Sequence, residues 1–156
     1  MGALLMVESL TGVANPIFEK IAATCRKHGV ALLFLFGSQA REGFKFLSGE
    51  PVSPNDSLTD LDVGVVTEES LPPPLERSKF YAGLYNELED ILQPFDLDLV
   101  LLEENHSVFQ AEAVKGICVF QVNEAKRDAY EMMVLRRAAD FRPYLERYLR
   151  EALEEV

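Results

Sequence analysis

Two pairs of aspartates occur at a spacing that could bring carboxylates together. Asp60 and Asp62 lie in one short apolar run and Asp96 and Asp98 in another, each pair separated by a single residue. Residues two apart on a β-strand point to the same face, with Cα atoms about 6 to 7 Å apart. Two ionised carboxylates on an apolar strand repel each other unless a cation neutralises them. Oxygen ligands without a neighbouring His or Cys favour Mg²⁺ or Mn²⁺, which takes its other ligands from water and substrate phosphates.

The second pair could complete the site begun by the first. If the two strands are neighbours, Asp96 or Asp98 would add a third carboxylate to Asp60 and Asp62. Three carboxylates around two metal ions stabilise the attacking and leaving oxygens in phosphoryl transfer. Both members of the second pair point the same way, so spacing alone leaves open which of them is the ligand.

A small-residue turn upstream has the properties of a triphosphate cradle. Gly37 and Ser38 directly follow a continuous apolar run and precede a short polar segment. Glycine lets a backbone approach a phosphate closely, and a following helix N-terminus offers amide donors and partial positive charge. Arg41, one helical turn further on, could reach a phosphate oxygen.

The elements that must position these residues alternate between helices and strands. Short apolar runs predict strands, and apolar residues at steps of three and four predict helices. The expected order is a helix over 15–29, a strand over 30–36, a short helical turn, a loop over 44–59, a strand over 61–66, a helix over 75–92, a strand over 95–102, a helix over 108–115, a strand over 117–122 and a C-terminal helical region over 123–156 that Pro143 should kink or divide. This order predicts one α/β domain spanning 1–156, with a mixed sheet of about four strands flanked by helices.

Charge and cysteine usage narrow the class of partners. The 156 residues carry a formal net charge of -11, which repels phosphate backbones and anionic lipid, so we expect no direct binding to nucleic acid or membranes. Cys25 and Cys118 are far apart, lack metal-ligand spacing and lie among apolar residues. No stretch reaches the roughly 18 apolar residues that a membrane helix needs. These features predict a cytoplasmic protein with reduced thiols.

Taken in order, the motifs resemble those of a known family. Gly-Ser-x-Ala-Arg at 37–41, Thr-Asp-x-Asp at 59–62 and a distal Asp98-Leu99-Val100 are similar to the signature of the minimal nucleotidyltransferases, in the polymerase-β-like superfamily. Residues 113–120 and 141–148 look like that family's helix, Gly and strand and its C-terminal helix. The chain departs from the family in a long spacer over 39–59, which reads as an insertion centred on 44–55, and in Glu42-Gly43, where a Gly usually follows the Arg directly.

The resemblance implies a nucleotidyltransferase fold and an activity. Asp60, Asp62 and Asp98 would bind Mg²⁺ or Mn²⁺, with Asp98 also the base for the incoming hydroxyl. Gly37, Ser38 and Arg41 would bind the triphosphate, and the substrate would be ATP. In many members the acceptor is a tyrosine of a HEPN-domain toxin, and the transferase is the antitoxin of that pair.

Two alternatives to this activity remain open. The chain could be a binding antitoxin or scaffold with a degenerate nucleotidyltransferase site, because its acidic charge also suits a basic partner. A small-molecule acceptor such as an aminoglycoside is the third reading, although the chain has no obvious substrate domain. The residues leave open the nucleotide base, the role of the insertion and whether the chain forms a homo-oligomer.

Overall fold

The structure is a computed structural model, and it describes residues 15–52 and 60–154. Within them a sheet of four strands has the order β3-β2-β1-β4. Strands β2 and β4 both pair antiparallel with β1, whereas β3 pairs parallel with β2. The strands are β1 (Val30–Phe36), β2 (Leu61–Thr67), β3 (Leu97–Leu101) and β4 (Ile117–Gln121). The predicted α/β fold, with a mixed sheet of four strands flanked by helices, is confirmed.

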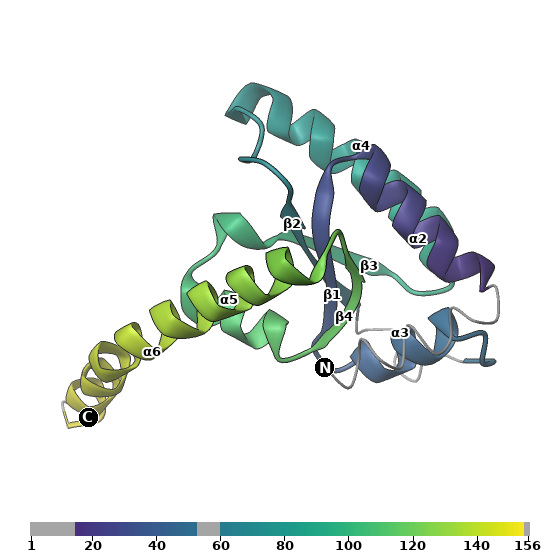
Figure 1. Ribbon diagram of the computed structural model, residues 1–156. Coiled ribbons are helices and arrows are strands. Elements are labelled where there is room, and N and C mark those ends of the chain that lie inside the picture. Colours follow the sequence, from purple (N-terminus) through teal and green to yellow (C-terminus); the bar gives the residue numbers. More distant parts are fainter. Residues whose placement is uncertain (1–14, 53–59, 155–156) are drawn as a thin grey trace.

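Helices cover both faces of this sheet (Figure 1). On one face α2 (Pro16–Lys27) and α4 (Pro74–Leu92) pack against each other and against a large aliphatic core. On the other face α5 (Ser107–Val114) and the start of α6 (Glu124–Glu154) cover a second core cluster. Because β1 is buried along its whole length between these layers, its sequence is a continuous apolar run.

The N-terminal part of the fold follows the sequence rules closely. Asn15 caps α2 by accepting a hydrogen bond at its side chain from the backbone N–H of Ile17, at 3.1 Å, and Pro16 occupies the first helical position. Gly29, with a φ of 69°, follows the helix and leads directly into β1. Cys25 and Cys118 are buried free thiols, as predicted.

One expectation about the local structure was wrong at its start. The loop predicted over 44–59 begins later, because α3 (Ala40–Leu47) continues as helix to Leu47. Within this extension the ring of Phe44 lies edge-on to that of Phe18, and Leu47 is fully buried in the core. Tertiary packing here overrides the turn signals that follow. Positions 53–59 of the predicted insertion lie outside the described residues.

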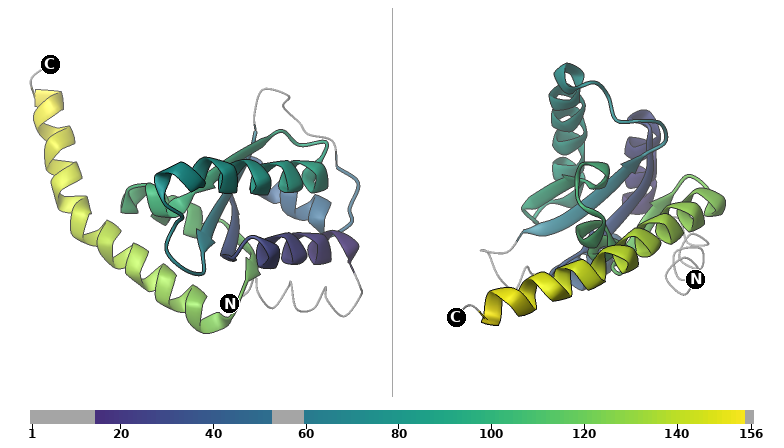
Figure 2. Two further views of the ribbon diagram at one scale, coloured as in Figure 1. Left: turned by 90° about the horizontal axis from the view of Figure 1, so that it is seen from above. Right: turned by 90° about the vertical axis from the view of Figure 1, so that its left-hand side faces the viewer.

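Pro143 does not divide the C-terminal helix. Helix α6 runs unbroken from Glu124 to Glu154, and Figure 2 shows one long helix that curves and leaves the body of the protein. Pro143 is exposed, so the carbonyl four residues earlier can bind water when it loses its helical partner. Several large side chains on this outer half are exposed, among them Tyr144, Tyr148 and Leu153. No helix among the described residues has both the length and the apolar character to cross a bilayer.

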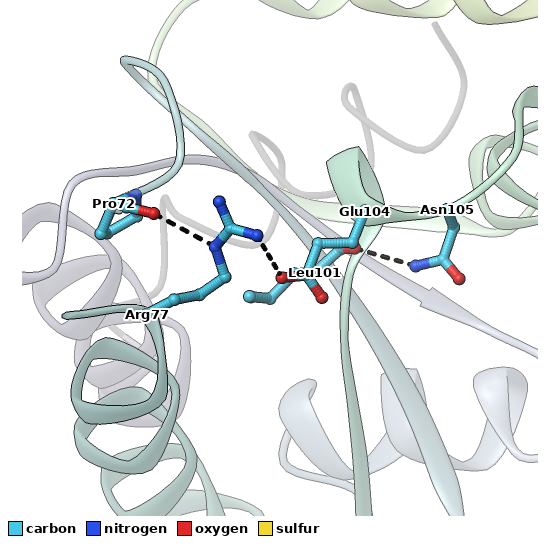
Figure 3. Close-up of polar contacts among 5 residues, drawn as sticks. All are labelled: Pro72, Arg77, Leu101, Glu104 and Asn105. Carbon is cyan, nitrogen blue, oxygen red and sulfur yellow. Dashed lines mark hydrogen bonds and ion pairs between the residues drawn. The ribbon is translucent and has the colours of Figure 1, made fainter. Parts of the chain in front are cut away.

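The end of the sheet formed by the last residues of β2 and β3 is held by satisfied polar contacts, and we call it the far end. The Thr67 backbone N–H and hydroxyl both donate to the Glu103 carboxylate, at 2.6 and 2.9 Å. Figure 3 shows the neighbouring contacts, in which the Arg77 guanidinium donates to the Pro72 carbonyl and the Glu104 carboxylate, each at 3.1 Å. Thus the carboxylates of Glu103 and Glu104 both have donors.

Candidate active site

The opposite end of the sheet brings two aspartates together, and we call it the carboxylate end. Asp62 on β2 lies directly opposite Asp98 on β3 in the parallel register. The residues on either side of each aspartate are buried in the core beneath α2 and α4. Since side chains alternate along a strand, both carboxylates point to the other face of the sheet. The end of β1 joins them there, because Phe36 pairs with Asp62.

The carboxylates interact strongly at this end. Partial burial, a hydrogen bond with Asp98, and the charges of Asp98 and Asp60 together raise the pKa of Asp62 from 3.8 to about 6. Within the described ranges, no Lys, Arg or His side chain forms an ion pair with any of these three aspartates. The site therefore concentrates negative charge that the neighbouring side chains leave uncompensated.

The structure distinguishes the positions of the two candidate third carboxylates, Asp96 and Asp98. Asp98 contacts Asp62, whereas Asp96 is absent from the groups that shift the pKa of Asp62. Asp96 lies before β3 and is exposed, and its backbone carbonyl accepts a hydrogen bond from the N–H of Leu61 at 2.8 Å. Asp60 precedes β2, is also exposed, and acts on Asp62 through its charge. Asp62 and Asp98 thus lie in contact, Asp60 is near enough for its charge to act on Asp62, and Asp96 precedes the strand beside them.

Gly37 closes the turn between β1 and α3 directly against this cluster. Its φ of 74° lies in the left-handed region, and a Cβ built there would lie 2.1 Å from Oδ2 of Asp62. Any side chain at position 37 would both strain the backbone and collide with the carboxylate. Glycine is therefore required for the turn to pass beside the aspartates.

The predicted phosphate-binding residues line a pocket next to the turn. Its volume is about 610 Å³, and Gly37, Ser38 and Arg41 belong to its wall. Lys115 and Gln39 also line it, and the sequence reasoning missed both. Lys115 could not be found from the sequence because its position depends on strand order: the pairing of β4 with β1 places the residues before β4 beside the Gly-Ser turn.

The donor set at the carboxylate end fits a hard divalent cation. Within 15–52 and 60–154 no three His, Cys, Asp or Glu side chains already form a metal-binding cluster. However, the oxygens of Asp62 and Asp98 are adjacent, and a doubly charged ion would relieve the repulsion that raises the pKa of Asp62. Substrate phosphates are the usual source of the remaining ligands for Mg²⁺.

Comparisons with known proteins bear on the family and the fold of the chain. A family model described as polymerase beta, nucleotidyltransferase, matches residues 19–125. No curated protein matched the sequence.

Several solved structures share the fold. A toxin–antitoxin complex with AMP-PNP aligns with a TM-score of 0.62 at 15% identity, over 87% of this chain and 98% of that one. The MntA–HepT toxin–antitoxin complex aligns with a TM-score of 0.58 at 14% identity, over 88% and 97%. A complex of tri-AMPylated Shewanella oneidensis HEPN toxin with MNT antitoxin aligns with a TM-score of 0.58 at 15% identity, over 88% and 96%. At these identities the likeness establishes the fold.

Proposed function

The chain belongs to the polymerase beta nucleotidyltransferase family, and from this premise we propose that it transfers AMP from ATP to a hydroxyl of a HEPN toxin partner. The observation that carries the proposal is the contact between Asp62 and Asp98 beside the Gly37 turn. Carboxylates and a phosphate cradle are the two parts that phosphoryl transfer requires.

The residues of the carboxylate end would divide the reaction between them. Asp60, Asp62 and Asp98 would hold Mg²⁺ or Mn²⁺, which when bound neutralises charge on the phosphate oxygens. Ser38 and the start of α3 would orient the triphosphate, with Arg41 at the pocket rim. Asp98 would accept the proton of the acceptor hydroxyl while the oxygen of that hydroxyl forms a bond to the α-phosphorus of ATP. The bond from that phosphorus to the bridging oxygen then breaks, and diphosphate leaves with the electron pair.

The similar structures support the choice of nucleotide and acceptor. One of them contains AMP-PNP, and another pairs an MNT antitoxin with a HEPN toxin that carries AMP. Transfer of AMP here would need ATP, and the two buried free thiols separately suit a reducing compartment such as the cytosol. The acceptor on the partner would be a tyrosine.

The test is transfer of label from ATP. We would incubate the purified chain with ATP labelled at the α-phosphate, Mg²⁺ and the product of the adjacent gene, and follow label on that partner. The double variant Asp60→Asn plus Asp62→Asn should abolish labelling. Asp96→Asn is the matched control, because it removes an equivalent exposed charge that does not contact Asp62, and it should keep most of the activity.

The second candidate, a non-catalytic binding antitoxin, predicts a different outcome. In that case the partner would carry no label, and the double variant would neutralise it as well as the wild-type chain does. Such a result would overturn the proposed transfer. Labelling of an aminoglycoside in place of the partner protein would move the acceptor to a small molecule.

A further inference from the structure

The face of α6 that packs on the body of the protein continues past the point where the helix leaves it. Apolar residues recur along this face at alternating steps of four and three, and we call them the stripe: Val134, Ala138, Phe141, Leu145, Tyr148 and Ala152. Val134 is buried and Ala138 packs on the core, whereas Tyr148 is 68% exposed. Figure 2 shows the outer half of α6, residues 136–154, extending away from the body. The stripe is therefore buried at its start and exposed over its outer half.

The spacing of the stripe is that of a coiled-coil seam. Steps of four and three average 3.5 residues, the period that keeps apolar side chains against a second helix. Pro143 stands two residues from both Phe141 and Leu145, so at about 100° per residue it lies on the opposite side of α6. The proline therefore leaves the stripe uninterrupted, and a second helix could cover it.

The charges of the outer half select the occupant and its direction. Residues 136–142 hold three arginines and one aspartate, whereas residues 151–154 hold two glutamates and no basic residue. We propose that the outer half of α6 pairs antiparallel with the outer half of a second copy of this chain. In that arrangement the basic start of each segment meets the acidic end of the other, twice by two-fold symmetry. Parallel pairing would bring like charges together.

Arg137 and Glu151 are the charges that this pairing brings together. They stand directly before Ala138 and Ala152 of the stripe and are two heptads apart, so they hold the same place beside the seam. In an antiparallel pair these places face each other, so Arg137 would meet Glu151 of the second copy. Arg137 forms no ion pair with any residue that the structure describes, and Glu151 pairs with exposed Arg147 at 3.8 Å. Both charges are therefore available to a second chain.

A pocket lies where α6 leaves the body, at the place that the end of the second helix would reach. Its volume is about 350 Å³, and its wall includes Arg137 and Tyr144 of α6 and Ser107 at the start of α5. The rings of His106 and Phe141, which also line it, lie 4.3 Å apart between centroids. Because Arg137 is aligned with Glu151 of the second copy, the last turn of that helix lies over this pocket. The body thus adds contacts to the helix pair.

The antiparallel direction also keeps the two acidic bodies apart. Each chain carries a formal net charge of -11, so direct contact between bodies would be repulsive. The bodies would instead lie at opposite ends of a helix pair roughly 28 Å long, the length of nineteen helical residues. Association through α6 therefore avoids the main electrostatic cost of bringing two copies together.

The first experiment is sedimentation equilibrium of the whole chain over a range of concentrations. The wild type should show a monomer and dimer in equilibrium, and Leu145→Asp should leave only monomer, because it places a charge in the seam. Met132→Asp is the matched control, since Met132 is 62% exposed on the opposite side of α6, and it should keep the dimer. Circular dichroism should show the same helix content in both variants when they are monomeric.

Charge reversal tests the antiparallel register without changing the stripe. Arg137→Glu and Glu151→Arg should each weaken the dimer by about tenfold, because each turns two attractions into two repulsions. The double variant has the wild-type composition and should restore the dimer. Arg136→Glu, an equal change on the other side of the helix, should leave dimerisation unchanged. Arg142→Gln should strengthen the dimer, since in this register Arg142 meets its own copy across the seam.

Three results would overturn the proposal. A wild-type chain that stays monomeric at every concentration is the first. A double variant no more dimeric than either single variant is the second, because parallel pairing gives no such rescue. The third is a Leu145→Asp variant that dimerises normally and instead loses binding to the product of the adjacent gene, since the stripe would then belong to that partner. The outcome is independent of AMP transfer, which the labelling experiment measures separately.

Discussion

The two ends of the sheet treat acidic side chains in opposite ways. At the far end Glu103 accepts hydrogen bonds from Thr67, and Glu104 pairs with Arg77. At the carboxylate end Asp62 and Asp98 face each other, and burial and repulsion raise the pKa of Asp62. The far end is arranged for stability, whereas the carboxylate end accepts a cost in free energy that a bound cation would relieve. Substitutions at the two ends should therefore change different quantities.

The largest effect is expected from the carboxylates themselves. Asp62→Asn should lower the rate of AMP transfer by more than about 100-fold, because even residues that only support a metal ligand cost 10- to 100-fold when changed. The measurement is incorporation of labelled AMP into the partner. A variant that retained a tenth of the wild-type rate would contradict the assignment of this end as catalytic.

Two glycines with the same backbone conformation, one at each end, sharpen the comparison. Gly37→Ala and Gly29→Ala both place a side chain at positive φ, which should cost about 1 to 3 kcal/mol of unfolding free energy. Only at Gly37 does the new Cβ collide with Asp62, since nothing lies within 4 Å at Gly29. Denaturant titration should show both losses, while transfer by the folded protein should fall only for Gly37→Ala. Equal activity losses would mean that the turn acts through stability alone.

At the far end the change should appear in stability and leave catalysis intact. Glu103→Ala leaves the backbone N–H of buried Thr67 without its acceptor, while the Thr67 hydroxyl can still donate to the Glu69 carbonyl, and it should lower the unfolding free energy by about 1 to 3 kcal/mol. Glu104→Ala, which removes only the exposed partner of Arg77, should cost less than about 1 kcal/mol. Urea denaturation measures both losses of unfolding free energy. A change in the AMP-transfer rate per folded molecule in either variant would contradict the separate roles of the two ends.

The smallest effect is a pH dependence of the metal-free chain. Because the pKa of Asp62 is raised when the protein folds, the folded state binds this proton before the unfolded state does. Stability should therefore rise as the pH falls from 7 through 6 toward 4, by on the order of 1 kcal/mol once solvent screening is allowed for. Thermal melts in EDTA should show this component in the wild type and not in Asp62→Asn. Parallel curves for the two proteins would contradict it.

Much of the carboxylate end was predictable because its signals are local. The apolar run of β1, the glycine that follows it and the alternation around Asp62 each follow from a few adjacent residues. The choice between Asp96 and Asp98 could not be made this way, since it depends on the register between β2 and β3. Lys115 was missed for the same reason, because its position depends on the pairing of β4 with β1.

The helices show the limit of local rules in another form. The extension of α3 to Leu47 depends on burial against the core, which the polar and glycine residues after it conceal. In α6 the reverse holds, since Pro143 is a strong local signal that an exposed helix tolerates. Tertiary environment decided both cases.

The parallel pairing of β2 with β3 also determines when the active site can come into existence. Asp62 and Asp98 meet only after the crossover through α4 has returned the chain to the sheet, and Gly37 meets them only after β1 has paired as well. Such non-local pairings form late, because closing long loops costs entropy before any contact repays it. A nascent or partly denatured chain therefore lacks the assembled carboxylates, and nucleotide binding can serve as an assay for completed folding.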